Sequence, residues 1–296
     1  MSQAFFSDRE GEARPRTQEE ITDAAWRGVV ALANRHFENG SLARDFPEYC
    51  EDGPWVISTN QPDIYNLLTS LVPELGGWPQ AGSRPRTVVA LDLIDFVAQH
   101  VAEPVRYPGR YHKFFDHYHL NFDDQAGRTK FRSEIDQVFA RNGIAFEIGP
   151  DNRVRRLGPP VIRESLRAAV FATGDREADA LLQAARERFL DPKVERRREG
   201  IEKLWDAFER VKTLEPGADK KAQTTTLLDR VAGQGTSFRT RLETESRELT
   251  DIGNKFQIRH TETNREPITD AALVDYLFSR AFALVWLELE KTGRTA

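Results

Sequence analysis

Two consecutive prolines near the middle of the chain, in the stretch Gly158-Pro159-Pro160, constrain its fold more than any other feature. Proline fixes the backbone φ angle and lacks an amide hydrogen, so a pair of prolines interrupts both a helix and a sheet ladder. The sequence before this point mixes helical and strand patterns, whereas nearly everything after it has helical periodicity. We therefore predict a mainly α protein with two domains, residues 1–158 and 161–296.

The composition excludes several classes of protein. The net charge of -5 over 296 residues gives no global cationic field, so nucleic-acid binding has to use local basic patches. Cys50 is the only cysteine, which excludes a disulfide within one chain and any multi-cysteine zinc or iron–sulfur site. No apolar run approaches the roughly 20 residues of a membrane span. We expect a cytoplasmic protein that does not contact a membrane.

The first domain is predicted to be an α+β domain. Helical patterns cover residues 17–37, which open with a capping box at Thr17, then residues 87–102, and a stretch from Phe131 to the Asn142-Gly143 stop signal. Residues 144–158 alternate around a Gly-Pro-Asp-Asn turn, which predicts a β-hairpin. Helix, helix, hairpin is the element order of a winged helix.

Two groups of arginines are candidates for nucleic-acid binding. The first group lies on the second strand of the predicted hairpin, and the second lies at the start of the helix expected at residues 194–213. The residues are Arg153, Arg155 and Arg156, and Arg196, Arg197 and Arg198. Such arginines are most often solvated side chains on or beside the exposed face of their element. The alternative is that they contact nucleic-acid phosphates.

A histidine-rich segment, YHKFFDHYHLNFD, places His112, His117 and His119 near Asp116 and Asp123. Imidazole and carboxylate groups at this spacing are able to bring two or three ligands to a metal ion. The aromatic residues at positions 111, 114, 115, 118 and 122 instead favour a packed hydrophobic segment whose histidines make local hydrogen bonds. We prefer this interpretation and expect neither a metal nor another cofactor.

The second domain is predicted to be a helical bundle. Its helices are expected at residues 162–172, 175–190, 194–213, 221–232, 237–257 and 270–291, and Thr269 is the expected N-cap of the last one. The last helix is apolar around most of its circumference, so it has to bury more than one side, either in its own core or against a partner. A partner would produce a two-fold homodimer.

An arginine and a histidine lie side by side in the stretch NKFQIRHTETN, near the predicted end of the helix at 237–257. His260 is suited to move protons to and from an RNA 2′-hydroxyl or a leaving oxygen, and Arg259 is suited to hold phosphate charge. The structural alternative is that His260 caps backbone carbonyls and Arg259 pairs with Glu262 or Glu266.

Several motifs resemble those of known families. FFSDREGEARPR, FPEYCEDG, GGWP, the segment YHKFFDHYHLNFDDQAGRTKFRSEIDQVFARNGIAFEI and RVRRLG resemble an N-terminal domain of AbiJ-like bacterial abortive-infection proteins. GIEKLWDAFERVKTL and IGNKFQIRHTE are similar to the HEPN superfamily of small helical domains. Together the two resemblances cover most of the chain. They imply a phage-defence protein whose HEPN-like bundle is a metal-independent endoribonuclease that acts as a homodimer.

The resemblance also implies site residues. HEPN nucleases have an arginine, then a polar residue, and then a histidine after a total gap of about four to six residues. His260 matches the histidine and Asn254 the polar residue, but the expected arginine is absent, because Gly253, Asn254 and Lys255 occupy its positions. Arg259 or Lys255 would have to replace it, although lysine lacks the bidentate fork of arginine. We expect RNA as the substrate, with a phage-derived trigger left open, and a non-catalytic, nucleic-acid- or nucleotide-binding HEPN-type dimer as the alternative.

Overall fold

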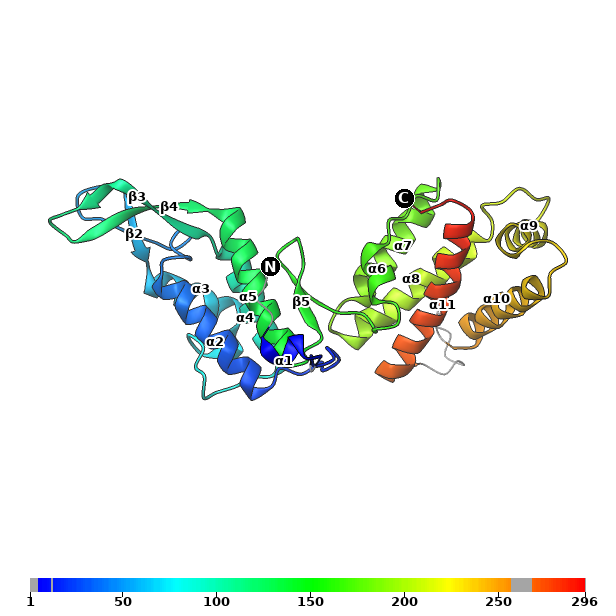
Figure 1. Cartoon of the computed structure of the whole chain (residues 1–296), viewed down its shortest axis with the longest axis horizontal. Coiled ribbons are helices and arrows are strands. Elements are labelled where there is room, and N and C mark those ends of the chain that lie inside the picture. Colours follow the sequence, from blue (N-terminus) through cyan, green and yellow to red (C-terminus); the bar gives the residue numbers. More distant parts are fainter. Residues whose placement is uncertain (1–4, 12, 257–267, 296) are drawn as a thin grey trace. The chain divides into compact units, whose positions relative to one another are not determined.

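The computed structural model describes residues 5–11, 13–256 and 268–295 (Figure 1). The chain divides into two compact units, Met1–Leu157 and Gly158–Ala296, so the division falls at the Gly158-Pro159-Pro160 stretch. The chain as a whole is mainly helical, and in the described residues the β-strands lie in the first unit.

Helices α2, α4 and α5 build the core of the first unit. Trp26, Ile94, Phe131 and Phe139 from these helices are almost completely buried in one hydrophobic cluster. The burial of such large apolar side chains is the main contribution that holds the unit together. The helices of this unit are α1 (Phe6–Arg9), α2 (Asp23–Glu38), α3 (Gln61–Leu71), the 3-10 helix η1 (Pro73–Leu75), α4 (Thr87–His100) and α5 (Asp124–Arg141).

Helix α2 begins later than the capping box at Thr17 predicts, so that prediction is wrong. The N-cap is Thr22, whose hydroxyl accepts a hydrogen bond from the backbone N–H of Ala25. The backbone N–H groups of Thr17 and Gln18 instead donate to the carbonyl oxygen of Gly143, at 3.0 and 2.9 Å. A backbone pairing between distant parts of the chain has therefore overridden a local helix signal.

Three two-stranded antiparallel sheets form within the described residues: β1 (Pro47–Tyr49) with β2 (Val56–Thr59), β3 (Glu103–His112) with β4 (His117–Asp123), and β5 (Phe146–Ile148) with β6 (Val154–Arg156). The last pair lies in the predicted hairpin segment. The β3–β4 hairpin replaces the packed hydrophobic segment expected there, and that expectation is wrong. Phe114 at its turn is 85% exposed, and Tyr111 and Tyr118 are also exposed.

The β3–β4 hairpin also changes the order expected for a winged helix. It separates α4 from α5, so the observed order is helix, hairpin, helix, hairpin. Helix α5 starts at Asp124 rather than Phe131, because the carboxylate of Asp123 accepts a hydrogen bond from the backbone N–H of Ala126 and caps it. Gly127 in its first turn lies directly against the backbone where β3 begins, since a Cβ there would be 2.3 Å from the carbonyl carbon of Ala102.

The second unit consists of helices close to the ranges predicted from the sequence, except that the first ends at Ala168 and not at residue 172. They are α6 (Arg163–Ala168), α7 (Arg176–Phe189), α8 (Val194–Val211), α9 (Lys220–Ala232), α10 (Ser237–Lys255) and α11 (Ala271–Lys291). Four of them begin at a side chain that accepts a hydrogen bond from the first turn, namely Asp175, Asp219, Thr236 and Asp270. The cap of α11 is thus Asp270 and not Thr269, its neighbour.

Helix α11 lies in the core of the second unit beside α7 and α8. The rings of Phe189 and Phe278 stack with centroids 3.6 Å apart, and Gly200 lets α8 approach the backbone of Phe189 on α7. The apolar residues of α11 that suggested a partner surface lie in this core: Val274, Leu277, Phe278, Phe282, Val285 and Leu289 are buried, and Trp286 is half-buried against it. Most of the apolar circumference of α11 is therefore covered by its own unit, although Leu273 and Tyr276 stay exposed, so the apolar pattern alone no longer argues for a dimer.

Candidate functional site in the helical unit

The end of α10 holds two of the four predicted catalytic residues. Asn254 and Lys255 lie in its last turn and are exposed. Arg259 and His260, the other two, lie outside the described residues.

Trp205 of α8 holds the last turn of α10 in place. The indole of Trp205 is fully buried, and its Nε1 donates a hydrogen bond to the backbone carbonyl oxygen of Leu249 at 2.9 Å. One turn further on, Gly253 lies against the same ring: a Cβ at this position would be 2.3 Å from the Trp205 Cδ1 and Nε1 atoms. This contact fixes the orientation of the last turn of α10 and thereby the direction in which the side chains of Asn254 and Lys255 point.

A pocket lies between α8, α9 and α10, and we refer to it as the basic pocket. It is lined by Glu209, Lys212, Lys220, Lys221, Thr224, Thr225, Leu228, Glu243, Ser246, Arg247 and Thr250. Its four cationic side chains outnumber its two carboxylates, and hydroxyl groups from α9 and α10 add hydrogen-bonding capacity. Such a lining suits an anionic ligand, such as the phosphates of a nucleic acid.

Glu209 organises the lysines of this pocket. Its carboxylate accepts a hydrogen bond from Lys212 Nζ at 2.7 Å and another from Lys220 Nζ, while Lys212 also donates to Thr250 Oγ1 at 2.7 Å. Burial alone would raise the pKa of Glu209, but the two lysine hydrogen bonds outweigh it and hold this pKa below its usual value. Burial lowers the pKa of Lys212, and the bond to Glu209 partly offsets this effect.

The basic pocket and the end of α10 share one helix face. Arg247, Thr250 and Asn254 are three and four positions apart, a spacing that aligns side chains along an α-helix. Arg247 and Thr250 line the pocket, and Asn254 follows one turn later. The side chain of Arg247 is 70% exposed, although it also contacts Glu243 at 3.2 Å. An extended polyanion that lies along this face would pass from the pocket to Asn254.

A buried carboxyl group lies near this network. Glu288 of α11 is fully buried, and neither of its carboxyl oxygens has a hydrogen-bond partner among the described residues. Burial raises its pKa to about 8, although the nearby charge of Lys212 opposes the shift. Glu288 is therefore mostly protonated and neutral near pH 7.

The arginine run at the start of α8 divides into different environments. Arg197 is buried, 1% exposed, and its Nη1 atom lies 3.3 Å from Asp275 Oδ1 on α11. Arg196 is exposed and pairs with Glu199 at 2.7 Å, and Arg198 is half-buried. Since a buried, paired guanidinium does not reach a nucleic-acid phosphate, we remove Arg197 from the candidate contacts. For Arg196 and Arg198 nucleic-acid binding stays a prediction.

The hairpin arginines differ in the same way. Arg156 is 3% exposed and pairs with Glu19 at 2.7 Å, so we also remove it from the candidate contacts. Arg155 is half-buried and pairs with Glu147 on the facing strand at 2.7 Å, whereas Arg153 is exposed. Nucleic-acid binding stays a prediction for Arg153 and, if its pair with Glu147 opens, for Arg155.

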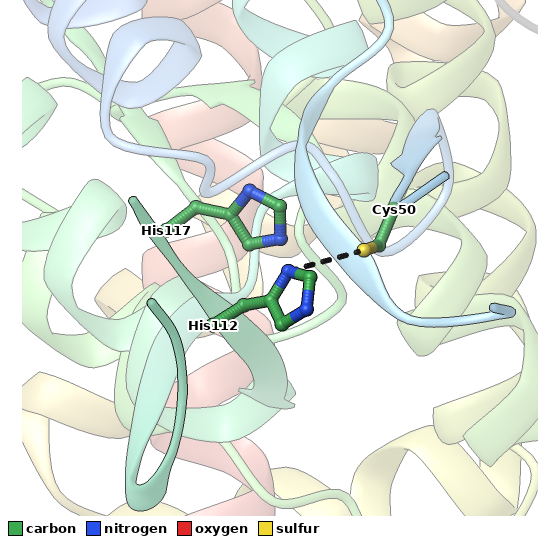
Figure 2. A group of neighbouring side chains, drawn as sticks. All are labelled: Cys50, His112 and His117. Atoms are coloured by element: carbon green, nitrogen blue, oxygen red, sulfur yellow. Dashed lines mark hydrogen bonds between the residues drawn. The ribbon is translucent and has the colours of Figure 1, made fainter. Parts of the chain in front are cut away.

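The predicted histidine cluster lies next to Cys50, which the sequence did not indicate as part of it. His112 and His117 face Cys50, which lies in the turn after β1 (Figure 2). The carboxylates considered as ligands are engaged elsewhere, because Asp116 accepts a hydrogen bond from Tyr111 and Asp123 caps α5. In the sequence, the CEDGPW turn marks Cys50 only as a loop residue, and its pairing with the hairpin required the tertiary structure.

Comparison of the chain with protein-family models, with curated proteins and with solved structures finds no match. Among the helices of the described residues, none combines the length and the hydropathy that are needed to cross a membrane.

Proposed function

We propose that this chain is an antiphage abortive-infection effector, a cytoplasmic endoribonuclease of HEPN type that cleaves RNA without a metal ion and acts as a homodimer. The active site is assigned to His260 and Arg259, with Asn254 and Lys255 as positioning groups. The family part of this proposal rests on the sequence resemblance. The observation that carries the site is the face of α10 on which the basic pocket leads to Asn254.

Each assigned group has a role in the cleavage. The imidazole of His260 removes the proton of a 2′-hydroxyl, whose oxygen attacks the adjacent phosphorus while the bond to the 5′-oxygen breaks. The leaving 5′-oxygen receives a proton from the second imidazole of the dimer, so that a 2′,3′-cyclic phosphate and a 5′-hydroxyl result. Arg259 and Lys255 stabilise the negative charge that develops on the phosphate. The cations of the basic pocket would hold the neighbouring phosphates.

The position of Gly253 favours a second candidate function. An arginine is expected at residues 253–255 in this family, but a side chain at position 253 would collide with Trp205, since even a Cβ would be 2.3 Å away. Without that arginine, the bundle would bind a nucleic acid or nucleotide as a dimer and would not cleave it. The two functions share the basic pocket and differ in the role of His260.

The test compares the wild type with His260→Ala during induced expression in a bacterial host, followed by growth and by the integrity of total RNA and tRNA. Growth arrest with discrete RNA fragments, both lost in His260→Ala, is the expected result. His100→Ala is the matched control, because His100 pairs with Asp45 in the first unit and should leave cleavage unchanged. The purified wild type should also cleave RNA in the presence of a chelator.

The contrary outcome is equally clear. If RNA stays intact in wild type and mutant, with and without phage infection, while the purified dimer binds RNA with the same affinity in both, the non-catalytic function is correct. Size-exclusion chromatography with light scattering that gives a monomer at micromolar concentration would contradict the two-imidazole mechanism.

A further inference from the structure

The β3–β4 hairpin gathers three histidines on one face. His112 and His117 are paired across the two antiparallel strands, and His119 follows His117 by two positions, which returns its side chain to the same face. The ring centroids of these histidines lie 5.4 to 5.9 Å apart. The exposed tyrosines Tyr111 and Tyr118 alternate with them.

The turn between β1 and β2 brings a thiol to this face. The turn is closed by backbone hydrogen bonds from Cys50 N–H to the Trp55 carbonyl oxygen at 2.8 Å and from Gly53 N–H to the Cys50 carbonyl oxygen at 3.2 Å. Cys50 is 5% exposed, and its Sγ lies 4.0 Å from His112 Nδ1. Figure 2 shows the sulfur directed toward the His112 ring, with His117 beside it. One potential ligand atom from each of these three residues lies within 4.8 Å of those of the other two.

Two imidazole nitrogens of the cluster have no partner within the part of the chain that the structure describes. His117 Nε2 and His119 Nε2 are buried and have no hydrogen-bond partner among the described residues. A buried polar atom without a partner costs about 1–3 kcal/mol. A metal ion would bind the lone pair of such a nitrogen, whereas the aromatic side chains around it offer no hydrogen-bond partner.

The third imidazole is oriented as a metal ligand usually is. His112 Nε2 lies 3.1 Å from Asp52 Oδ2, in the same turn as Cys50, and this leaves Nδ1 facing the thiol. A carboxylate that accepts a hydrogen bond from the second ring nitrogen fixes the tautomer and increases the basicity of the nitrogen that binds the metal. Asp52 would therefore support His112 without binding the ion itself.

We propose that Cys50, His112 and His117 hold a zinc ion that joins the β1–β2 turn to the β3–β4 hairpin. One thiolate and two neutral imidazoles form a ligand set that zinc prefers. Tetrahedral zinc, with bonds of about 2.3 Å to sulfur and about 2.05 Å to nitrogen, places these atoms about 3.6 Å apart. The observed sulfur–nitrogen distance of 4.0 Å therefore has to close by only about 0.4 Å.

The fourth ligand position is assigned to His119. Its ring stacks on Trp55 with centroids 5.4 Å apart, so a side-chain rotation that keeps the hairpin intact is needed to bring Nε2 to the ion. The zinc site belongs to the first unit and is separate from the proposed RNA site, which needs no metal. It replaces the sequence-based expectation that the chain holds no cofactor.

The experiment titrates the purified, metal-free full-length chain with Co²⁺ as a spectroscopic substitute for zinc. A cobalt–thiolate charge-transfer band and tetrahedral d–d bands, saturating at one ion per chain and displaced by Zn²⁺, are expected for the wild type. Cys50→Ala should abolish the charge-transfer band, and Asp52→Asn should keep it but bind zinc roughly 10- to 100-fold more weakly. His119→Ala should keep the charge-transfer band, shift the d–d bands because water takes the fourth position, and bind Co²⁺ more weakly than the wild type.

The matched control is His100→Ala, which removes a histidine of the same unit that pairs with Asp45. It should bind Co²⁺ like the wild type. Thermal unfolding distinguishes lost binding from lost fold: zinc should raise the midpoint of the wild type but not of Cys50→Ala, whose midpoint should equal that of the metal-free wild type. A wild type without a charge-transfer band, or a Cys50→Ala variant that retains it, would overturn the proposal.

Discussion

A buried hydrogen bond joins Trp205 of α8 to Leu249 of α10, from the indole Nε1 to the backbone carbonyl oxygen, at 2.9 Å. Gly253 packs on the same indole, so one side chain sets both the spacing of the two helices and the direction of the last turn of α10. Asn254 and Lys255 take their positions from this contact. The proposed function therefore depends on a packing feature that does not itself contact RNA.

Gly253→Ala is expected to destabilise the second unit. The added Cβ would be 2.3 Å from Trp205, which is fully buried, so α10 would have to shift. Overpacking of this kind costs about 1–3 kcal/mol. Urea unfolding measures the loss, and the mutant should also cleave RNA less well because Asn254 moves. Asp251→Ala, an exposed change on the same helix, is the control and should leave both properties nearly unchanged. An unchanged unfolding midpoint in Gly253→Ala would show that the contact is not tight.

The helices of the second unit were predictable because their signals are local. Side chains such as Asp219 and Thr236 cap the first turn of the helix in which they stand, and a glycine such as Gly233 ends α9. Thr17 carries the same kind of signal and failed, because its backbone pairs with Gly143, more than a hundred residues away in the sequence. Local patterns therefore located elements well where no distant strand competed for the backbone.

The candidate sites were predictable only in part, for the same reason. Asn254 and Lys255 follow from the sequence near His260, but the basic pocket combines Lys212, the residue after α8, with lysines from α9 and an arginine from α10. Cys50 approaches His112 across 62 positions. Arg197 lies on the predicted helix, yet its partner Asp275 is 78 positions away, and nothing near it in the sequence indicates that it is buried.

Asp275→Asn should destabilise the second unit more than Arg197→Met does. The first change removes the carboxylate that lies 3.3 Å from the guanidinium of Arg197, which is 1% exposed, and removing one partner of a buried ion pair costs up to about 3–5 kcal/mol. The second change removes the charge and keeps an apolar side chain of similar length, which is often neutral in such pairs. Chemical denaturation of both variants measures the difference. Arg196→Met is the control, because its exposed pair with Glu199 is worth less than about 1 kcal/mol. Equal losses in Asp275→Asn and Arg196→Met would contradict this prediction.

Glu288 should make the second unit less stable as the pH rises. Burial raises its pKa in the folded protein to about 8, above the ordinary value of 4.5 that applies in the unfolded chain. Between these values the folded state binds one more proton than the unfolded state, so the stabilisation is complete below pH 4.5 and is lost progressively up to about pH 8. The side chain of Glu288→Gln stays neutral at every pH. The unfolding free energy of this variant, relative to that of the wild type, should therefore increase by an amount on the order of a few kcal/mol from pH 5 to 8.

The control for Glu288 is Glu290→Gln, since Glu290 is exposed on the same helix. The difference in unfolding free energy between wild type and this control should not change over the same pH range. Parallel pH profiles for the wild type and Glu288→Gln would mean that the folded carboxyl group ionises at its ordinary pKa.

If RNA binds in the basic pocket, the salt dependence of its affinity should decrease when cationic side chains of the pocket are removed. Lys221 and Arg247 line the pocket and are exposed, so each is able to release a counterion when it contacts a phosphate. Replacing both with glutamine should weaken binding to single-stranded RNA and reduce the slope of log affinity against log salt by about 0.7 for each lost contact. Lys193→Gln, an exposed change at the opposite end of α8, is the control and should keep the wild-type slope. If the double variant keeps the wild-type slope, RNA does not lie in this pocket, and the path along α10 to Asn254 has to be given up even if His260 proves essential for cleavage.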